Sequence, residues 1–454
     1  MLRTVINNGI LIDPGNKINA RLNLAVENGR ISEINARPLK GDVELDAEGL
    51  VIAPGFIDLH IHEGEYMPKE GRFDTTIFEC LLRMGVTTAV GGNCGIGSED
   101  PGQYLAAVNR HGLPINVGLL VPHETLRIQV DATNRYLPVP DNKILAMQEL
   151  ADKYLSAGCL GISFGIRYIP GISNKELLEI SHMVKRRHCF IAAHLRDDAD
   201  QIMTAAAEFI EVGRELNIPV QVSHIGSMAG FGQMGEFLDM MDHEAGSGLD
   251  ITADCYPYHA FSTFIGATTY DDGFIDRYGI GYEAIEVAEG PYRGHRLTEA
   301  RFHELRKSSP RLLTIAHVMK EPEITMAMKH PRVMAASDGL INARQGHPRV
   351  AGTFPRLLGE YVRERKLMTL FQAIEKMTVM PARRLGIRKG TLEVGADADI
   401  TVFNPDVIKD RATFEDPLAP PSGIRWIFIN GRLALQDMEM LIPNAGIAIA
   451  PASE

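Results

Sequence analysis

Short apolar runs alternate with amphipathic stretches through the middle of the chain. Helical periodicity follows most of these runs, as at 174–187, 199–216 and 232–241. Such an alternation is typical of βα units that surround a parallel sheet. The pattern therefore predicts an α/β fold, and eight runs predict a (β/α)8 TIM barrel with its chemistry at the C-terminal strand ends. The runs occupy residues 56–62, 87–94, 115–121, 161–166, 190–195, 220–225, 251–256 and 333–337.

A ninth apolar run, at 312–318, does not fit the barrel pattern. We assign it to a long insertion between the seventh and eighth strands, at about residues 263–332. The insertion is rich in glycine and tyrosine, and we expect it to form a lid over the barrel mouth. A doubly wound open sheet is the alternative architecture, but no glycine-rich phosphate-binding fingerprint follows any run.

Both ends of the chain carry short alternating runs separated by turn signals. Asn-Gly steps, which are typical of hairpin turns, stand between these runs at 8–9, 28–29 and 430–431. The N-terminal unit alone is too small to bury a core. We therefore expect residues 1–53 and 389–454 to form one small β-sandwich domain beside a barrel domain at 54–388.

Composition and charge narrow the class of protein. The 454 residues suit a barrel with a companion domain, and the 46 basic and 58 acidic residues give a net charge of −12. No basic run suggests a nucleic-acid partner, and no apolar stretch is long enough to span a membrane. Five cysteines, an odd number, argue against a disulfide framework. With no secretion signal at the N-terminus, we predict a cytoplasmic protein that binds a small molecule, with homo-oligomerisation left open.

The first barrel run carries two histidines with the geometry of metal ligands. His60 and His62 lie at positions i and i+2, and alternation along a strand points both side chains to one face. Imidazole is a ligand for zinc, iron and nickel. Two hydrogen-bonded histidines would be the plainer interpretation of such a pair alone, but burying both rings on an apolar strand is costly unless something binds them.

Other residues that can bind metals also lie at the ends of the apolar runs. Cys94, His194 and His224 end the second, fifth and sixth runs, and Asp338 follows the eighth. Each has an ordinary explanation when taken alone, since free cysteines are often buried and aspartates often lie in turns. In a barrel, however, all strand C-termini open into one mouth. The sequence therefore predicts that these residues meet His60 and His62 at one centre.

At this point the chain resembles the amidohydrolase superfamily, and more narrowly the N-acyl-D-amino acid deacylases, or D-aminoacylases. The similarity extends over nearly the whole chain, and the combination of Asn-Cys-Gly with Tyr-Pro-Tyr is specific to this branch. The matching stretches are GFIDLHIH at 55–62, GNCG at 92–95, GISFG at 161–165, HLRDD at 194–198, DCYPY at 254–258, SDG at 337–339 and HPR at 347–349.

The resemblance implies a ligand set. His60 and His62 would hold the more exposed metal position, and Cys94 would ligate the deeper one, with a bridging role open to it. The deeper site would be completed by His194 and His224. Many amidohydrolases use a carboxylated lysine as the bridging ligand; the run 161–166 contains no lysine, so Cys94 is a consistent substitute. Thiolate and imidazole ligands together favour zinc, as one or two ions.

The resemblance also implies the reaction. Zinc-activated water would hydrolyse the amide bond of an N-acyl-D-amino acid, with Asp338 as general base and acid and as a ligand of the exposed metal. Tyr256 would stabilise the oxyanion or orient the substrate. Ser262 and Arg349 would bind the substrate carboxylate, because a guanidinium matches a carboxylate bidentately.

One position departs from the family pattern. Close relatives carry a lysine where this chain has Gly226, and that lysine also meets the substrate carboxylate. We hypothesise that Arg167 or Lys320 supplies the missing charge, or that the substrate lacks a standard carboxylate.

Three other interpretations remain. The stretch 161–165 matches the G-x-S-x-G pattern of serine hydrolases, with Ser163 as the nucleophile, but that motif needs a helix directly after the serine, and the next helix begins only near 173–174. A cyclic-amide hydrolase similar to hydantoinases or dihydroorotases would keep the metal barrel and change the substrate. A non-catalytic scaffold of the same fold is expected to lose metal ligands, whereas all six positions are occupied here.

Overall fold

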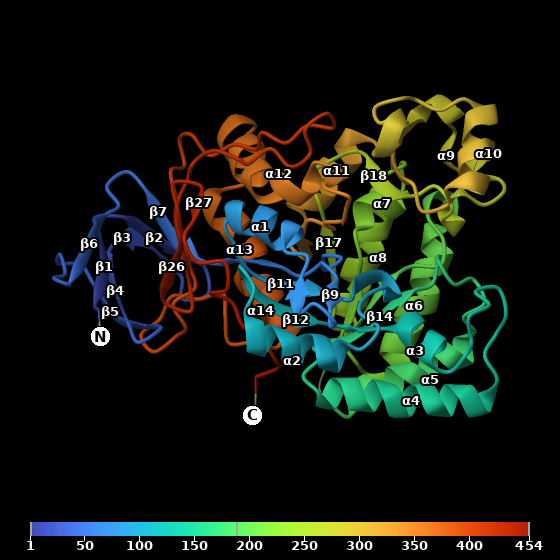
Figure 1. Ribbon diagram of the computed structural model, residues 1–454, viewed down its shortest axis with the longest axis horizontal. Helices are drawn as coiled ribbons and strands as arrows, with labels where there is room; N and C mark the ends of the chain where they lie inside the picture. Colours follow the sequence, from blue (N-terminus) through green and yellow to red (C-terminus); the bar gives the residue numbers. More distant parts are fainter. Residues whose placement is uncertain (1, 188, 453–454) are drawn as a thin grey trace.

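The computed structural model describes residues 2–187 and 189–452 and has a parallel barrel at its centre (Figure 1). The eight runs predicted from the sequence form its strands, with the third run split into β12 and β13. This confirms the predicted α/β barrel. The strands are β8 (Phe56–Asp58), β11 (Val86–Gly91), β12 (Asn116–Leu119), β13 (Val121–Pro122), β14 (Gly161–Gly165), β15 (Phe190–His194), β16 (Val220–Val222), β17 (Ile251–Cys255) and β21 (Val333–Ala335).

The barrel strands pair in parallel in two sets, and further hydrogen bonds join the sets. β8, β11 and β12 form one set, and β13 to β17 with β21 form the other. The sets join where the Leu160 amide donates to the Leu119 carbonyl at 2.8 Å. On the opposite side the Ser337 amide donates to Asp58 Oδ1 at 3.0 Å, which ties the last strand to the first. The strand ends that carry the candidate ligands therefore face one mouth.

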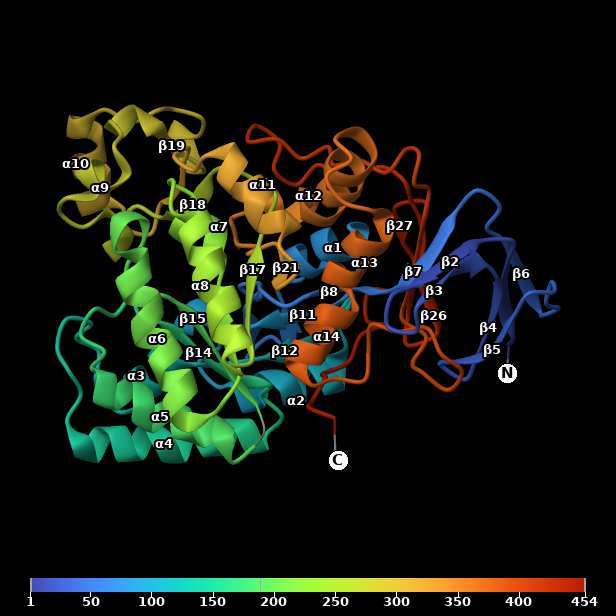
Figure 2. The ribbon, with the colours of Figure 1, turned by 180° about the vertical axis from the view of Figure 1, so that it is seen from behind.

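Helices cover the outside of the barrel (Figures 1 and 2). In α5, Leu177, Ile180 and Val184 form the buried stripe, and the Ser173 side chain caps the helix by accepting from the Glu176 amide at 3.1 Å. No helix within the described ranges is long and apolar enough to cross a bilayer. The helices are α1 (Thr76–Arg83), α2 (Pro101–His111), α3 (His123–Gln129), α4 (Asp141–Ser156), α5 (Asn174–Lys185), α6 (Ile202–Leu216), α7 (Ile225–Ala229), α8 (Met234–Gly246), α11 (Glu321–Lys329), α12 (Arg349–Arg356), α13 (Leu370–Met377) and α14 (Val379–Leu385).

The insertion after the seventh strand forms a separate layer. Its sheet consists of β18 (Phe261–Phe264), β20 (Leu313–Ala316) and β19 (Ile285–Val287), all antiparallel, so the ninth apolar run lies outside the barrel. Two short helices, α9 (Phe274–Tyr278) and α10 (Glu299–Ser308), extend this layer on the side away from the chain termini (Figure 1).

The two ends of the chain form a β-sandwich, as predicted. One sheet has the order β5-β4-β1-β6, and the other has the order β27-β26-β25-β24-β7-β2-β3 (Figure 2). Apolar residues of both ends fill the space between the sheets, including Leu24, Ile52 and Phe428. The strands are β1 (Thr4–Asn7), β2 (Ile10–Asp13), β3 (Ile18–Arg21), β4 (Asn23–Glu27), β5 (Arg30–Asn35), β6 (Val43–Asp46), β7 (Val51–Pro54), β24 (Ile400–Phe403), β25 (Ile424–Ile429), β26 (Arg432–Gln436) and β27 (Glu439–Met440).

Two of the three Asn-Gly steps form hairpins, and one does not. Residues 28–29 connect β4 to β5, and residues 430–431 connect β25 to β26. The hairpin predicted at 8–9 is wrong, because β1 and β2 lie in different sheets. β1 pairs with β4 and β6, whereas β2 pairs with β3 and β7, so the turn carries the chain across the sandwich.

Candidate metal centre

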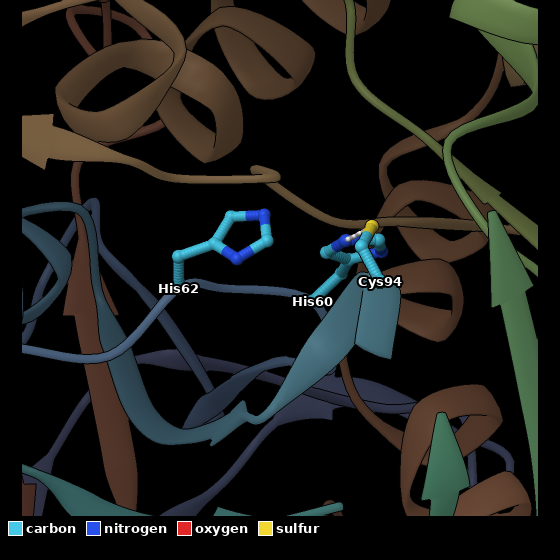
Figure 3. Close-up of side chains that lie close together, drawn as sticks. All are labelled: His60, His62 and Cys94. Atoms are coloured by element: carbon cyan, nitrogen blue, oxygen red, sulfur yellow. Dashed lines mark hydrogen bonds between the residues drawn. The ribbon is translucent and has the colours of Figure 1, made fainter. Parts of the chain in front are cut away.

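The six candidate ligands lie at one end of the barrel, each at or just after a strand. His194 ends β15, His224 lies two residues after β16, and Asp338 lies three residues after β21. His60 and His62 follow β8 (Figure 3). The remaining candidate, Cys94, lies in the single turn η1 (Asn93–Gly95) after β11.

Cys94 lies between two groups of histidines. The donor atoms of Cys94, His60 and His62 lie within 4.8 Å of one another, and those of Cys94, His194 and His224 do so too. Its Sγ is 3.3 Å from His60 Nε2, the contact drawn in Figure 3, and 3.2 Å from His224 Nε2. One sulfur atom is thus within reach of both groups.

Asp338 joins the first group and is held by an arginine. Its Oδ1 lies 3.4 Å from the Nε2 atoms of both His60 and His62, and its Oδ2 lies 2.8 Å from Arg349 Nη1. Burial acts to raise the pKa of Asp338, but Arg349 and His60 outweigh it and hold this pKa well below its usual range. The carboxylate is therefore ionised in the pH range where proteins are stable.

The charges and orphaned atoms of this cluster fit a divalent cation. Burial acts to raise the pKa of the Cys94 thiol, but His224 and His60 hold it well below its usual range, which favours the thiolate. Burial acts to lower the pKa of His62, but Asp338 and Cys94 raise it to about 9. Neither ring nitrogen of His194 has a hydrogen-bond partner within the described residues, although both are buried. Buried nitrogen and sulfur donors of this kind match the ligand preferences of zinc.

Asp254 supports two of the candidate ligands and was not predicted as a site residue. Its Oδ1 accepts from the His60 ring at Nδ1, 3.2 Å away, and from the His224 backbone amide at 2.8 Å. The contact with His60 Nδ1 leaves His60 Nε2 free to face Cys94. The other oxygen of Asp254, Oδ2, accepts from Gln221 Nε2 at 2.9 Å. A carboxylate behind a histidine ligand orients the ring and raises its basicity. In the sequence, Asp254 lies within the seventh run and begins the matching stretch at 254–258, but neither feature pointed to a role behind the histidines.

A narrow cavity opens over the cluster. Ser262 is the predicted substrate-binding residue that lines it, and its hydroxyl donates to the Thr314 carbonyl at 2.9 Å. No role was predicted for several other residues that line the cavity, because they lie in the insertion or in the segments that follow barrel strands, where the sequence shows no periodicity. These are Tyr168, Asp198, Ser227, Phe261, Thr263, Thr269 and Tyr278.

Arg349 and Tyr256 lie together behind this cavity. The Arg349 guanidinium lies 4.6 Å from the centre of the Tyr256 ring, and both side chains are buried. Neither Arg349 Nε nor the Tyr256 hydroxyl has a hydrogen-bond partner within the described residues. Neither side chain lines the cavity, so a role for these two residues in substrate binding stays a prediction.

The side chains packed around Gly226 leave little room at the position where close relatives carry a lysine. A Cβ at this position would lie 2.9 Å from Ile324 Cδ1 and 3.0 Å from Cys255 Sγ, so a larger side chain would need a rearrangement there. Arg167 does not line the cavity, and its guanidinium already pairs with Asp197 Oδ1 at 2.6 Å. A role for Arg167 in substrate binding therefore stays a prediction, and it would require this ion pair to open.

Two buried side chains outside the metal centre have structural roles. Ser163 lies in the interior of β14, fully buried, and no helix starts directly after it, so it does not form the elbow of a serine hydrolase. His123 belongs to a buried ion cluster in which its Nε2 lies 3.0 Å from Glu176 Oε1. Arg127 completes this cluster with a contact of 2.6 Å to Glu176 Oε2.

Known proteins share both the sequence and the fold of this chain. The model of the amidohydrolase family matches residues 284–433. The D-aminoacylase of Alcaligenes xylosoxydans xylosoxydans is 32% identical, and the match covers 97% of this chain and 96% of the relative.

Two solved structures cover 99% of this chain and 99% of their own. One comes from work on the binuclear metal centre of D-aminoacylase and has a TM-score of 0.89 at 28% identity. The other, N-acyl-D-glutamate deacylase from Bordetella bronchiseptica with zinc and a phosphonate mimic of the tetrahedral intermediate, has a TM-score of 0.88 at 30% identity. Together with the end-to-end sequence match, this shows that the chain belongs to the amidohydrolase superfamily of metal-dependent hydrolases, in its D-aminoacylase branch.

Proposed function

We propose that this protein is a zinc-dependent hydrolase that removes the acyl group from N-acyl-D-amino acids. The observation that carries the proposal is the shared position of Cys94 between His60 and His224, with Asp338 beside the first histidine. The choice of N-acyl-D-amino acids rests on the relatives, since the D-aminoacylase of Alcaligenes and the N-acyl-D-glutamate deacylase of Bordetella bear those names.

The metal would be held by residues of both donor groups. His194 and His224 would hold one ion with Cys94, and His60 and His62 would hold a second with Asp338, so one or two ions fit the donor set. A bound zinc ion supplies Lewis acidity, which activates water and polarises the amide carbonyl.

Asp338 would move the proton. Its carboxylate is kept ionised by Arg349, so it can accept a proton from the attacking water. The same group can then deliver this proton to the amide nitrogen as the amine leaves, and one carboxylate serves both steps because the proton gained is the proton required. An alanine at 338 would remove this route without removing the other five proposed ligands.

Arg349, Tyr256 and Ser262 would orient the substrate. Arg349 presents an unpartnered Nε, and a guanidinium binds a carboxylate with charge-assisted hydrogen bonds. The Tyr256 hydroxyl, which is also unpartnered, would donate to the oxygen that gains negative charge during attack. Ser262 would donate to the substrate from the cavity wall after leaving its contact with Thr314.

The test is a screen of paired D and L N-acetyl amino acids that measures amine release with and without added zinc. We expect release from D substrates only, dependence on zinc, and loss of activity in Asp338→Ala. Hydantoin and dihydroorotate belong in the same screen, because their hydrolysis would support the cyclic-amide alternative. Zinc-loaded protein that hydrolyses none of the linear N-acyl amino acids would refute the proposal.

A further inference from the structure

Ser163 is bonded to the turn that carries Cys94. Its hydroxyl accepts from the Gly95 amide at 3.0 Å and donates to the Gly92 carbonyl. These two backbone groups flank Cys94 on either side in the chain. Ser163 is fully buried, so water cannot replace its hydroxyl in either bond without a rearrangement.

The turn needs such support because its backbone is in an unfavourable conformation. Cys94 has φ of 54° and ψ of 26°, in the left-handed region. A non-glycine residue is strained in this region, so surrounding contacts must hold it there. On one side the Asn93 side chain donates to the carbonyls of Leu59 at 3.1 Å and Val90 at 2.9 Å. On the other side, the Ser163 hydroxyl bonds the Gly95 amide and the Gly92 carbonyl.

The fourth barrel strand is shaped to receive this turn. A Cβ on Gly165 would lie 2.1 Å from the Cys94 carbonyl oxygen, and a Cβ on Gly95 would lie 2.5 Å from the Gly165 nitrogen. The two backbones therefore pack directly against each other, which only glycine permits at these positions. The stretch at 161–165 is thus the docking surface for the Cys94 turn.

We propose that Ser163 is a positioning residue for Cys94. By fixing both ends of the turn, it keeps Cys94 Sγ at 3.2 Å from His224 Nε2 and 3.3 Å from His60 Nε2. The inference rests on the proposed function in one respect, namely that Cys94 is a metal ligand. Without the hydroxyl, the buried Gly92 carbonyl and Gly95 amide lose their partner, and a buried unpaired group is costly enough to release the turn.

The first experiment compares Ser163→Ala with Ser181→Ala by competition of zinc with a chelating dye. Ser181 is equally buried, and its hydroxyl donates to the Leu177 carbonyl at 2.7 Å within α5, so it is a matched control. We expect zinc affinity to fall about 10-fold or more in Ser163→Ala, as for other residues that support metal ligands, and less than about 2-fold in Ser181→Ala. In a Cys94→Ala background, Ser163→Ala should cause no further loss.

The second experiment uses metal-free protein, so its outcome does not depend on the proposed function. The alkylation rate of Cys94 by iodoacetamide is measured by peptide mapping, with buried Cys159 as the internal standard. We expect the ratio of the Cys94 rate to the Cys159 rate to rise about 5-fold or more in Ser163→Ala, because opening of the turn exposes the thiol, and to stay unchanged in Ser181→Ala.

An unchanged alkylation ratio in folded Ser163→Ala would overturn the inference. So would a zinc affinity that falls equally in the Cys94→Ala background. If Ser163→Ala does not fold, Ser163→Cys takes its place, because a thiol is a weaker donor and acceptor than a hydroxyl and should give a partial effect in the same direction. A parent protein that binds no zinc would refute the proposed function, whereas the alkylation ratio would still decide the role of Ser163.

Discussion

At the mouth of this barrel, some residues position the proposed metal ligands without being ligands themselves. Asp254 shows this most clearly, since one of its oxygens bonds both the His60 ring and the His224 amide. Two proposed ligands on different strands thus depend on one carboxylate, which is not itself among the grouped metal-donor residues. Removing its charge should loosen both at once.

We predict that Asp254→Asn lowers zinc affinity by about 10- to 100-fold, the range found when a group that supports a metal ligand is changed. The amide can still accept one hydrogen bond, but it cannot stabilise the His60 ring electrostatically as a carboxylate does. Dye competition measures the change. Asp250→Asn is the control, because Asp250 pairs with Arg384 at 2.6 Å just before the same strand, outside the site. Equal affinities in the two variants would contradict this role of Asp254.

At the scale of elements, a buried polar cluster links the start of α3 to the start of α5. Glu176 at the start of α5 bonds His123 at the start of α3 and Arg127 one turn later. Burial acts to raise the pKa of Glu176, but His123 and Arg127 outweigh it and lower this pKa. The Glu176 carboxylate is therefore ionised, and it pairs with the Arg127 guanidinium.

We predict that Glu176→Gln destabilises the protein by about 3–5 kcal/mol, the usual cost of leaving a buried charge without its partner. Here the uncompensated charge is that of Arg127. Urea unfolding at neutral pH measures the loss. Glu179→Gln on the same helix changes a partly exposed residue that accepts from Gln148 at 3.0 Å, and it should cost less than about 0.5 kcal/mol. A similar small loss in both variants would show that the cluster does not stabilise the fold.

Lys376 fastens α13 to the last barrel strand. Its ammonium group is buried and donates to the carbonyls of His330 and Val333. Burial lowers the pKa of Lys376 from an ordinary value of 10.5 to about 8. The folded protein therefore releases this proton at lower pH than the unfolded chain does.

We predict that the parent gains stability relative to Lys376→Met as the pH rises from 8 to 10.5. Below this window both the folded and the unfolded chain hold the proton, and the cost of burying the charge is present in full. Within the window only the unfolded chain keeps the proton, so folding becomes more favourable by up to about 3 kcal/mol. Urea unfolding of both proteins at about pH 7.5 and about pH 10 gives the difference. A difference that does not change with pH would contradict the shift.

On the scale of the whole molecule, the sequence predicted the arrangement best where periodicity and topology act together. His60 and His62 were placed by strand alternation, and the approach of Cys94 to them follows from the barrel, in which distant strand ends meet. Periodicity does not identify long-range hydrogen-bond partners. Asp254 lies 194 residues from His60 along the chain. Likewise, the turn at 8–9 has the sequence of a hairpin, and only the facing sheet shows that it crosses the sandwich.

The central claim is that residues scattered over much of the chain bind zinc through a shared cysteine. X-ray absorption at the zinc edge of the loaded protein tests this most directly, with Cys94→Ala as the comparison. We expect a sulfur atom at about 2.3 Å from zinc in the parent, with nitrogen and oxygen at about 2.0–2.2 Å, and no sulfur in the variant. A zinc environment of nitrogen and oxygen alone in the parent would contradict the account.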